Sequence, residues 1–298
     1  MKHKLGTTLL VLSCTAMLAG CGSTEQTDNS TGLTEETALN AIYEANQNDA
    51  LLEHYDSFGA VFAFYTADGE TNSMYQYMDA DLFVSEAGSD IMIEENDTLR
   101  GFSDETKRPF IYIIPSTIRE SGVFMLTPDD GTEEISSIET VDGQIVVTSH
   151  ASDRAILESV LQEYGYDSND VEQIEIVYTL DAETLAIVHS SASAKMVSGE
   201  SHVMQEVTGR PNDEKYVADP TLMEQLNSTD TRHLKLVYGL DTPDEQIIEA
   251  DVPKGVLAFY AVADGYEETP YKDSSYTVPY VFDESLTLDQ TLYFKPLA

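Results

Sequence analysis

Short runs in which apolar residues alternate with small or polar ones, separated by turn residues, constrain the fold of this chain more than any other feature. Phe58, Phe62 and Phe64 fall on one side of such a run, and residues 74–78 form the next run after a turn at residues 67–70. Side chains along a β-strand point alternately to opposite faces, so a period of two broken by turns predicts antiparallel hairpins.

Further runs of this kind extend the prediction to most of the chain. Gly, Asp, Asn and Pro bound them, and these residues favour turns. Successive antiparallel strands would form a meander. The additional predicted strands cover residues 82–85, 90–94, 110–114, 123–126, 135–140, 144–148, 173–180, 185–197, 202–207, 233–238, 255–262 and 291–294.

Helical segments precede the predicted strands and also lie between them. Thr34 is a suitable N-cap for a helix in which apolar residues recur at helical spacing, and another turn or two follows at residues 50–55. Ser152 is placed to cap an amphipathic helix with apolar residues at i, i+3, i+4 and i+7, which Gly165 ends. Helices before and between runs of antiparallel strands predict an α+β fold, in which the apolar helix faces cover a sheet.

Residues 34–209 resemble the LolA-like and LppX-like lipoprotein fold. The resemblance rests on the first helix ending in Ala45-Asn46 and Leu51-Leu52, the meander, the helix at Ser152, and the strand-turn-strand around residues 181–185. It implies a curved antiparallel sheet, or half-barrel, closed by helices, with an apolar hollow that can hold acyl chains. No basic residue here matches a position that binds a lipid headgroup.

The C-terminal part has a different character. Residues 210–230 are predicted to be a connector with Pro220 at a first helical position. Residues 231–298 contain Asp264-Gly265-Tyr266 and Tyr271-Lys272-Asp273, and resemble the Listeria–Bacteroides repeat, a small β-grasp-like module, although its usual Trp is absent. The resemblance implies a separate domain that acts as a spacer or adhesive unit and has no active site.

The first 21 residues predict where the chain resides. Lys2 and Lys4 precede an apolar run over residues 5–16, which is shorter than the roughly 20 residues of a membrane-spanning helix. Leu-Ala-Gly-Cys at residues 18–21 resembles the lipobox of bacterial lipoproteins. By that resemblance residues 1–20 are a signal peptide, and Cys21 carries the lipid that anchors the chain to the extracytoplasmic face of the cell membrane. The alternative is an ordinary cleaved signal in which Cys21 is incidental. Residues 22–32 are polar or small and lack an apolar period, so residues 21–33 are predicted to be a flexible tether.

Cysteine content and charge exclude several classes of function. With Cys14 in the signal and Cys21 lipidated, no thiol is left for a disulfide, a metal or catalysis. The chain has 15 basic and 54 acidic residues; removing residues 1–20, which hold two lysines, changes its net charge from −39 to 13 − 54 = −41. Nucleic acid and anionic headgroups are therefore poor partners. Asp79 with Asp81, and Asp129 with Asp130, could bind Ca2+, but neither pair has EF-hand spacing.

Motifs that would indicate an enzyme are weak. Residues 199–203 (GESHV) begin like a nucleophile elbow but lack its closing Gly, and no Walker loop or dinucleotide-binding glycine motif is present. We expect no catalytic residue, no metal site and no cofactor. The histidines outside the signal do not show the paired spacing of zinc ligands: His54, His150, His189, His202 and His233.

Aromatic residues of the first hairpin are the candidates for ligand binding. Phe62, Phe64, Tyr75 and Tyr77 could line a hollow, while the same alternation is typical of ordinary core packing. The sequence thus predicts a non-catalytic, lipid-anchored surface lipoprotein with a binding or interaction role and a possible protein partner. The alternative is a LolA-like carrier of a lipid or other apolar ligand.

Overall fold

The computed structural model describes most of the chain after the tether. The described residues are 33–96, 98–113, 133–151, 154–243, 245–260, 262, 265–281 and 286–297. The signal segment, Cys21, the strand at 123–126 and the Ser152 cap lie outside them. No described helix has the length and apolarity needed to cross a bilayer.

The described residues form two compact units. The first unit holds residues 33–55, 60–72 and 133–210, and the second holds 56–59, 73–113 and 211–297. This division differs from the predicted boundaries, because residues 73–113 group with the C-terminal part rather than with the other strands of the meander.

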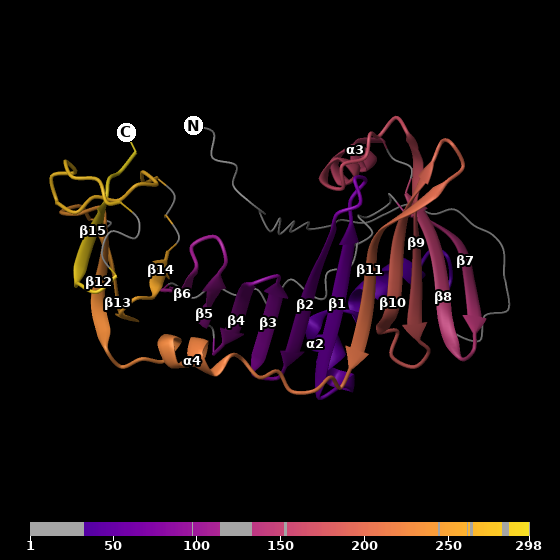
Figure 1. The fold of residues 1–298 in the computed structure, drawn as a ribbon, viewed down its shortest axis with the longest axis horizontal. Helices are drawn as coiled ribbons and strands as arrows, with labels where there is room; N and C mark the ends of the chain where they lie inside the picture. Colours follow the sequence, from indigo (N-terminus) through magenta and orange to yellow (C-terminus); the bar gives the residue numbers. More distant parts are fainter. Residues whose placement is uncertain are drawn as a thin grey trace. The chain divides into compact units, whose positions relative to one another are not determined.

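The first unit is an antiparallel sheet in the strand order β1-β11-β10-β9-β8-β7 (Figure 1). Val147 lies opposite Tyr178, and Tyr178 lies opposite Ser190, so alternate side chains of three strands share one face. The register shifts between Ala192 and Ser193, where β10 pairs with β11. The strands are β1 (Ser57–Tyr65), β7 (Glu133–Val141), β8 (Gln144–Ala151), β9 (Val171–Asp181), β10 (Ile187–Met196) and β11 (Ser201–Pro211).

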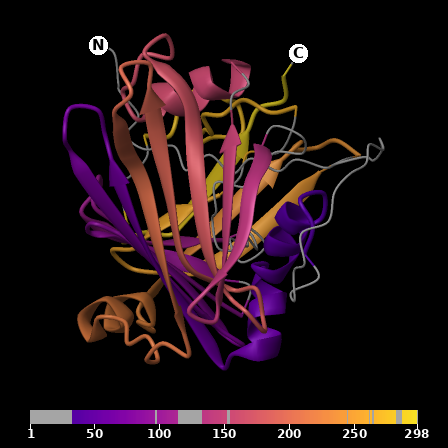
Figure 2. The ribbon, with the colours of Figure 1, turned by 90° about the vertical axis from the view of Figure 1, so that its right-hand side faces the viewer.

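Three helices belong to the first unit: α1 (Ala38–Ala45), α2 (Asn48–His54) and α3 (Arg154–Glu163). The predicted N-cap at Thr34 is wrong, because α1 begins four residues later. Thr34 instead starts a preceding turn, in which its carbonyl oxygen accepts the Ala38 N–H at 2.9 Å. Figure 2 shows α1 and α2 beside the strands and α3 across their upper end.

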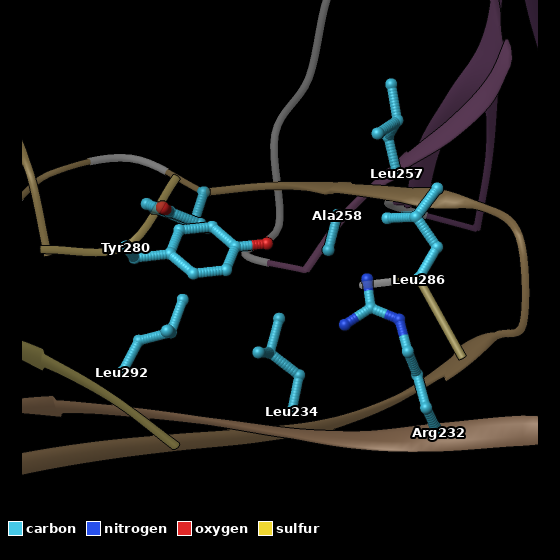
Figure 3. A pocket seen from close by; sticks show the side chains of 8 residues that line it. Arg232, Leu234, Leu257, Ala258, Tyr280, Leu286 and Leu292 are labelled. Atoms are coloured by element: carbon cyan, nitrogen blue, oxygen red, sulfur yellow. The ribbon is translucent and has the colours of Figure 1, made fainter. Parts of the chain in front are cut away.

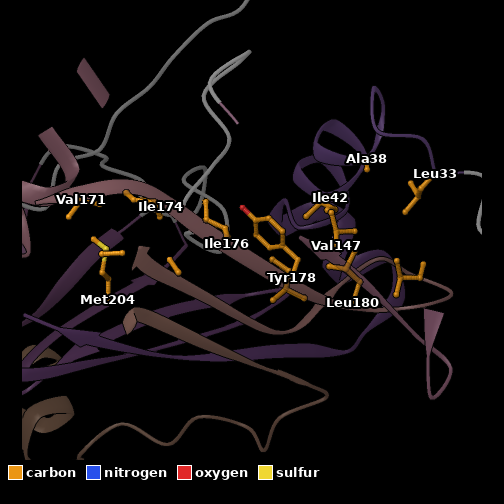
Figure 4. Close-up of a cluster of buried hydrophobic side chains, with 14 of the residues drawn as sticks. Leu33, Ala38, Ile42, Val147, Val171, Ile174, Ile176, Tyr178, Leu180 and Met204 are labelled. Carbon is orange, nitrogen blue, oxygen red and sulfur yellow. The ribbon is translucent and has the colours of Figure 1, made fainter. Parts of the chain in front are cut away.

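The core of the first unit lies on one face of this sheet (Figure 4). Alternate residues of β9 are buried there, which follows from the period of two along the strand. Ala38 and Ile42 of α1 and Leu161 of α3 belong to the same cluster. Asn46 fixes the end of α1, because its amide donates to the Leu185 carbonyl at 3.1 Å and accepts the Ile187 N–H at 2.8 Å.

The second unit contains an antiparallel run in the order β6-β5-β4-β3-β2, with β14 added in parallel beside β6. Leu257 pairs with Phe110, and Phe259 pairs with Tyr112. The sequence did not predict β5. Its strands are β2 (Thr71–Asp79), β3 (Leu82–Ala87), β4 (Asp90–Glu95), β5 (Thr98–Ser103), β6 (Arg108–Tyr112) and β14 (Leu257–Phe259).

A three-stranded sheet, β13-β12-β15, completes the second unit. It consists of β12 (Thr231–Tyr238), β13 (Gln246–Pro253), which was not predicted, and β15 (Gln290–Phe294). Its buried residues form one apolar cluster, against which Phe102 of β5 and Ile111 of β6 pack. This packing and the pairing of β14 with β6 are why the C-terminal residues do not form a unit of their own.

The predicted connector contains α4 (Pro220–Leu226), whose start is as predicted. The Asp219 carboxylate accepts the N–H groups of Thr221 and Leu222 at 2.7 and 2.9 Å, and Pro220 occupies the first helical position. Leu222 joins the apolar cluster of the three-stranded sheet. The described residues form mostly antiparallel β-sheet, as predicted, with few helices.

Candidate ligand-binding site

The two phenylalanines predicted to contact a ligand lie on β1 in the first unit. Phe62 is fully buried, and its ring lies 6.4 Å from that of Phe64 and nearly parallel to it. Tyr65, on the opposite face, donates its hydroxyl to Glu206 at 2.7 Å. In this structure Phe62 therefore packs as a core residue.

The two predicted tyrosines lie on β2 in the second unit. Tyr75 donates to a carboxylate oxygen of Asp213 at 2.9 Å, and Tyr77 donates to Asp79 at 3.1 Å. The Tyr216 ring lies 6.2 Å from that of Tyr77, in a cluster that also includes Met223. The chain around residues 213–223 thus packs against both tyrosines.

A group of polar side chains that the sequence did not single out interrupts the core of the first unit. Ser149 on β8 donates its hydroxyl to the Glu133 carboxylate on β7 at 2.8 Å. Tyr178 on β9 also hydrogen-bonds to Glu133. Ser149 and Tyr178 are 0% and 1% exposed, and Glu133 is partly buried. We call Glu133, Ser149 and Tyr178 the polar cluster.

Burial changes the acid–base chemistry of the polar cluster. It raises the pKa of Glu133 from the ordinary 4.5 to about 7, although the hydrogen bonds from Ser149 and Tyr178 act in the opposite direction. Burial, together with the neighbouring Glu133 charge, raises the pKa of Tyr178 well above 10. At neutral pH the carboxyl group can therefore be either neutral or ionised, while the phenol remains a hydrogen-bond donor.

A second pair of polar side chains belongs to the same unit. Tyr164 donates its hydroxyl to the Gln205 amide oxygen at 3.2 Å, and burial raises the pKa of Tyr164 to about 12. Gln205 on β11 lies opposite Ala192. A small cavity with room for about one water molecule is bounded by Ile176, Tyr178, Ser190, Ser191, Ala192 and Gln205.

The sequence contained a signal for part of this site. Ile145, Val147, Ser149 and Ala151 occupy alternate positions of β8, and all four are buried. A serine in a series of apolar core positions marks a polar group that needs a partner. No comparable pattern marks Glu133, at the start of β7.

Other candidate sites hold conventional interactions. Asp79 accepts the N–H groups of Asp81 and Leu82, each at 2.9 Å, so this carboxylate organises a turn. His202 Nε2 lies 3.7 Å from Glu200, both on the surface. Among the described residues, no three His, Cys, Asp or Glu side chains are grouped as metal ligands would be. Asp129 and Asp130 lie outside the described residues.

These features define a predominantly antiparallel β protein with polar groups set into a buried sheet face. Three solved structures are similar to parts of it. LprF from Mycobacterium bovis matches 62% of this chain and 97% of its own at 10% identity and a TM-score of 0.33. The Mycobacterium tuberculosis lipoprotein LppX matches 60% and 98% at 12% identity and a TM-score of 0.30. A LolA superfamily protein from Nitrosomonas europaea matches 60% and 94% at 8% identity and a TM-score of 0.22.

The similar structures come from the groups that the sequence resemblance named. At these values the likeness is distant. No protein-family model and no curated protein matches the chain. The resemblance of residues 231–298 to a β-grasp module stays a prediction.

Proposed function

We propose that this protein is a non-catalytic lipoprotein, anchored through Cys21 on the extracytoplasmic face of a bacterial membrane, and that its folded part has a binding role. The lipobox-like residues 18–21 and the polar tether support the anchor. The polar cluster of the first unit carries the binding role, because it places a titratable carboxyl and two hydroxyls within an otherwise apolar core.

The ligand that fits this chemistry is an apolar molecule with a neutral or cationic polar end. Apolar side chains stabilise a bound alkyl group by about 25 cal/mol per Å2 of buried surface. Glu133 can accept a hydrogen bond from a hydroxyl or pair with an ammonium group, and an ammonium would in turn favour its ionised form. The described cavity beside Tyr178 is water-sized, so an alkyl chain requires core side chains, such as those of α1 or α3, to move aside.

Binding can be tested with the full chain purified without detergent. Native mass spectrometry with solvent extraction would identify a co-purified lipid, and a fluorescent long-chain amine would be titrated against the matching fatty acid. We expect the amine to bind at least tenfold more tightly. Glu133→Gln should remove this preference, and Glu134→Gln, at the adjacent and 80% exposed position, should leave it unchanged.

A role in surface interactions is the second candidate. Among the described strands, β7 is the last of the sheet, and it has exposed acidic side chains, including Glu134 and Glu139, on a chain with a net charge of −39. Such an edge suits a basic extended partner. Absence of lipid and of probe binding would reject the carrier role and leave this one. Binding of a basic peptide that Glu134→Lys weakens at constant ionic strength would support it.

A further inference from the structure

Arg232 is a buried cation in the second unit. It lies near the start of β12, opposite Val252 of β13, and is only 2% exposed. Burial lowers the pKa of Arg232 below its usual 12.5, but a guanidinium remains protonated in proteins. A positive charge thus sits inside an apolar cluster, and such burial is costly unless the charge is compensated.

The described residues satisfy this guanidinium weakly. One terminal nitrogen donates to the Gln290 side-chain oxygen at 3.3 Å and the other to the Val256 carbonyl at 3.4 Å, both longer than the usual 2.7–3.2 Å. The buried Nε has no hydrogen-bond partner among the described residues. Both acceptors are neutral, so neither supplies a counter-charge.

A small cavity lies in front of the guanidinium. Figure 3 shows Arg232 and the Tyr280 hydroxyl pointing toward the same space from opposite sides. Leu234, Ala258 and Leu286 form apolar parts of its wall, and it has room for about one water molecule.

The geometry points to a binding site for one small monovalent anion of about the size of chloride, held between Arg232 and Tyr280. This site is separate from the polar cluster and does not depend on the proposed function.

Charge, size and polarity each select this class of ligand. One guanidinium compensates one negative charge, and the available space excludes phosphate, sulfate and long carboxylates. Apolar walls favour an anion that loses its hydration easily, and the net charge of −39 disfavours multiply charged anions further. A chloride accepting hydrogen bonds from Arg232 and Tyr280 would link β12 to the chain that precedes β15.

Thermal unfolding of the full chain tests the proposal. Tm would be measured in sodium chloride against sodium isethionate at equal ionic strength, since the isethionate anion is too large for the cavity. Above its Kd, chloride should raise Tm by roughly 3 °C for each tenfold increase in concentration, because it binds the folded state only. Tyr280→Phe should weaken chloride binding about fivefold.

Arg232→Met should abolish the chloride effect, and Arg210→Met, which removes an exposed arginine, should preserve it. Crystals of the wild-type protein soaked in bromide should give an anomalous peak beside Arg232. This measurement does not depend on the folding of a variant. Equal Tm values in chloride and isethionate, or a cavity without bromide, would overturn the proposal.

Discussion

At the scale of single residues, Glu133 should make the stability of the first unit depend on pH. Its pKa is about 7 in the folded chain against an ordinary 4.5, so the folded state binds the proton more tightly than the unfolded state. The contribution of this group to the free energy of unfolding is most favourable below pH 4.5, and it is lost between pH 4.5 and about 7. Above pH 7 the buried carboxylate destabilises the fold by up to about 3 kcal/mol, from 1.36 kcal/mol per pKa unit.

Glu133→Gln removes this titration while keeping a side chain that can accept hydrogen bonds from Ser149 and Tyr178. We expect the variant to be more stable than the wild type by about 1–3 kcal/mol at pH 8 and nearly equal to it at pH 4.5. Urea unfolding at the two pH values measures the difference. Glu134→Gln is the matched control, and equal effects of the two variants would contradict the assignment to a buried carboxyl.

At the residue scale, the period of two along a strand indicates which side chains are buried, while the ligand-binding role of the four aromatic residues stays a prediction. Phe62 and Tyr77 are buried, as alternation along a strand indicates. Glu133 could not be identified in this way, because its environment depends on a side chain two strands away. The register of β7 against β8 also shifts between Ile135 and Ser137, and local pattern does not encode such a shift.

At the scale of elements, Gly101 is required for β5 to pair with β4. A Cβ atom there would lie 1.7 Å from the Ile91 carbonyl oxygen and 3.1 Å from the Phe110 ring. The first contact is with backbone, so a side-chain rotation cannot relieve it. We expect Gly101→Ala to destabilise the second unit by about 3 kcal/mol or more.

Denaturant unfolding followed by tyrosine fluorescence would measure this loss. Gly143→Ala, in an open turn with a φ of +82°, is the comparison, since its backbone strain alone costs about 1 kcal/mol. If the Gly101→Ala protein were as stable as the Gly143→Ala protein, the spacing of β4 and β5 would be able to widen without loss of stability.

The same glycine helps to explain why β5 was missed. Thr-Leu-Arg-Gly-Phe-Ser alternates imperfectly and contains a residue that usually weakens strands. Strand β13 lies at an edge, and half of its residues, including Ile247, are exposed, so burial leaves little pattern in its sequence. Strong alternation, as in β9, or an Asp-Pro start, as in α4, made other elements predictable.

At the scale of the whole molecule, the C-terminal residues should not fold alone. Phe102 of β5 and Ile111 of β6 pack against the apolar cluster of the three-stranded sheet. Strand β14 pairs with β6. A fragment of residues 231–298 would expose these surfaces. We expect it to lack a cooperative thermal transition by circular dichroism, while residues 22–298 unfold cooperatively. A sharp transition in the fragment would instead support the predicted separate domain. The predicted boundaries rest on local strand patterns. Such patterns carry no information on parallel pairing between strands that are about 145 residues apart in the sequence.

The anchor is also a property of the whole molecule, because it determines where both units act. Residues 18–21 and the tether predict that Cys21 carries a diacylglycerol and that residues 1–20 are removed. A single acyl chain binds membranes marginally, at about 0.8 kcal/mol per buried CH2, while two chains anchor stably.

Cys21→Ala should therefore shift the protein from the membrane fraction to the medium or leave it unprocessed, and Cys14→Ala, within the signal, should not change its location. Mass spectrometry of the wild-type N-terminus should find acylated Cys21 as the first residue. An unmodified Cys21, with the protein still on the membrane, would show that something other than this lipid retains it there.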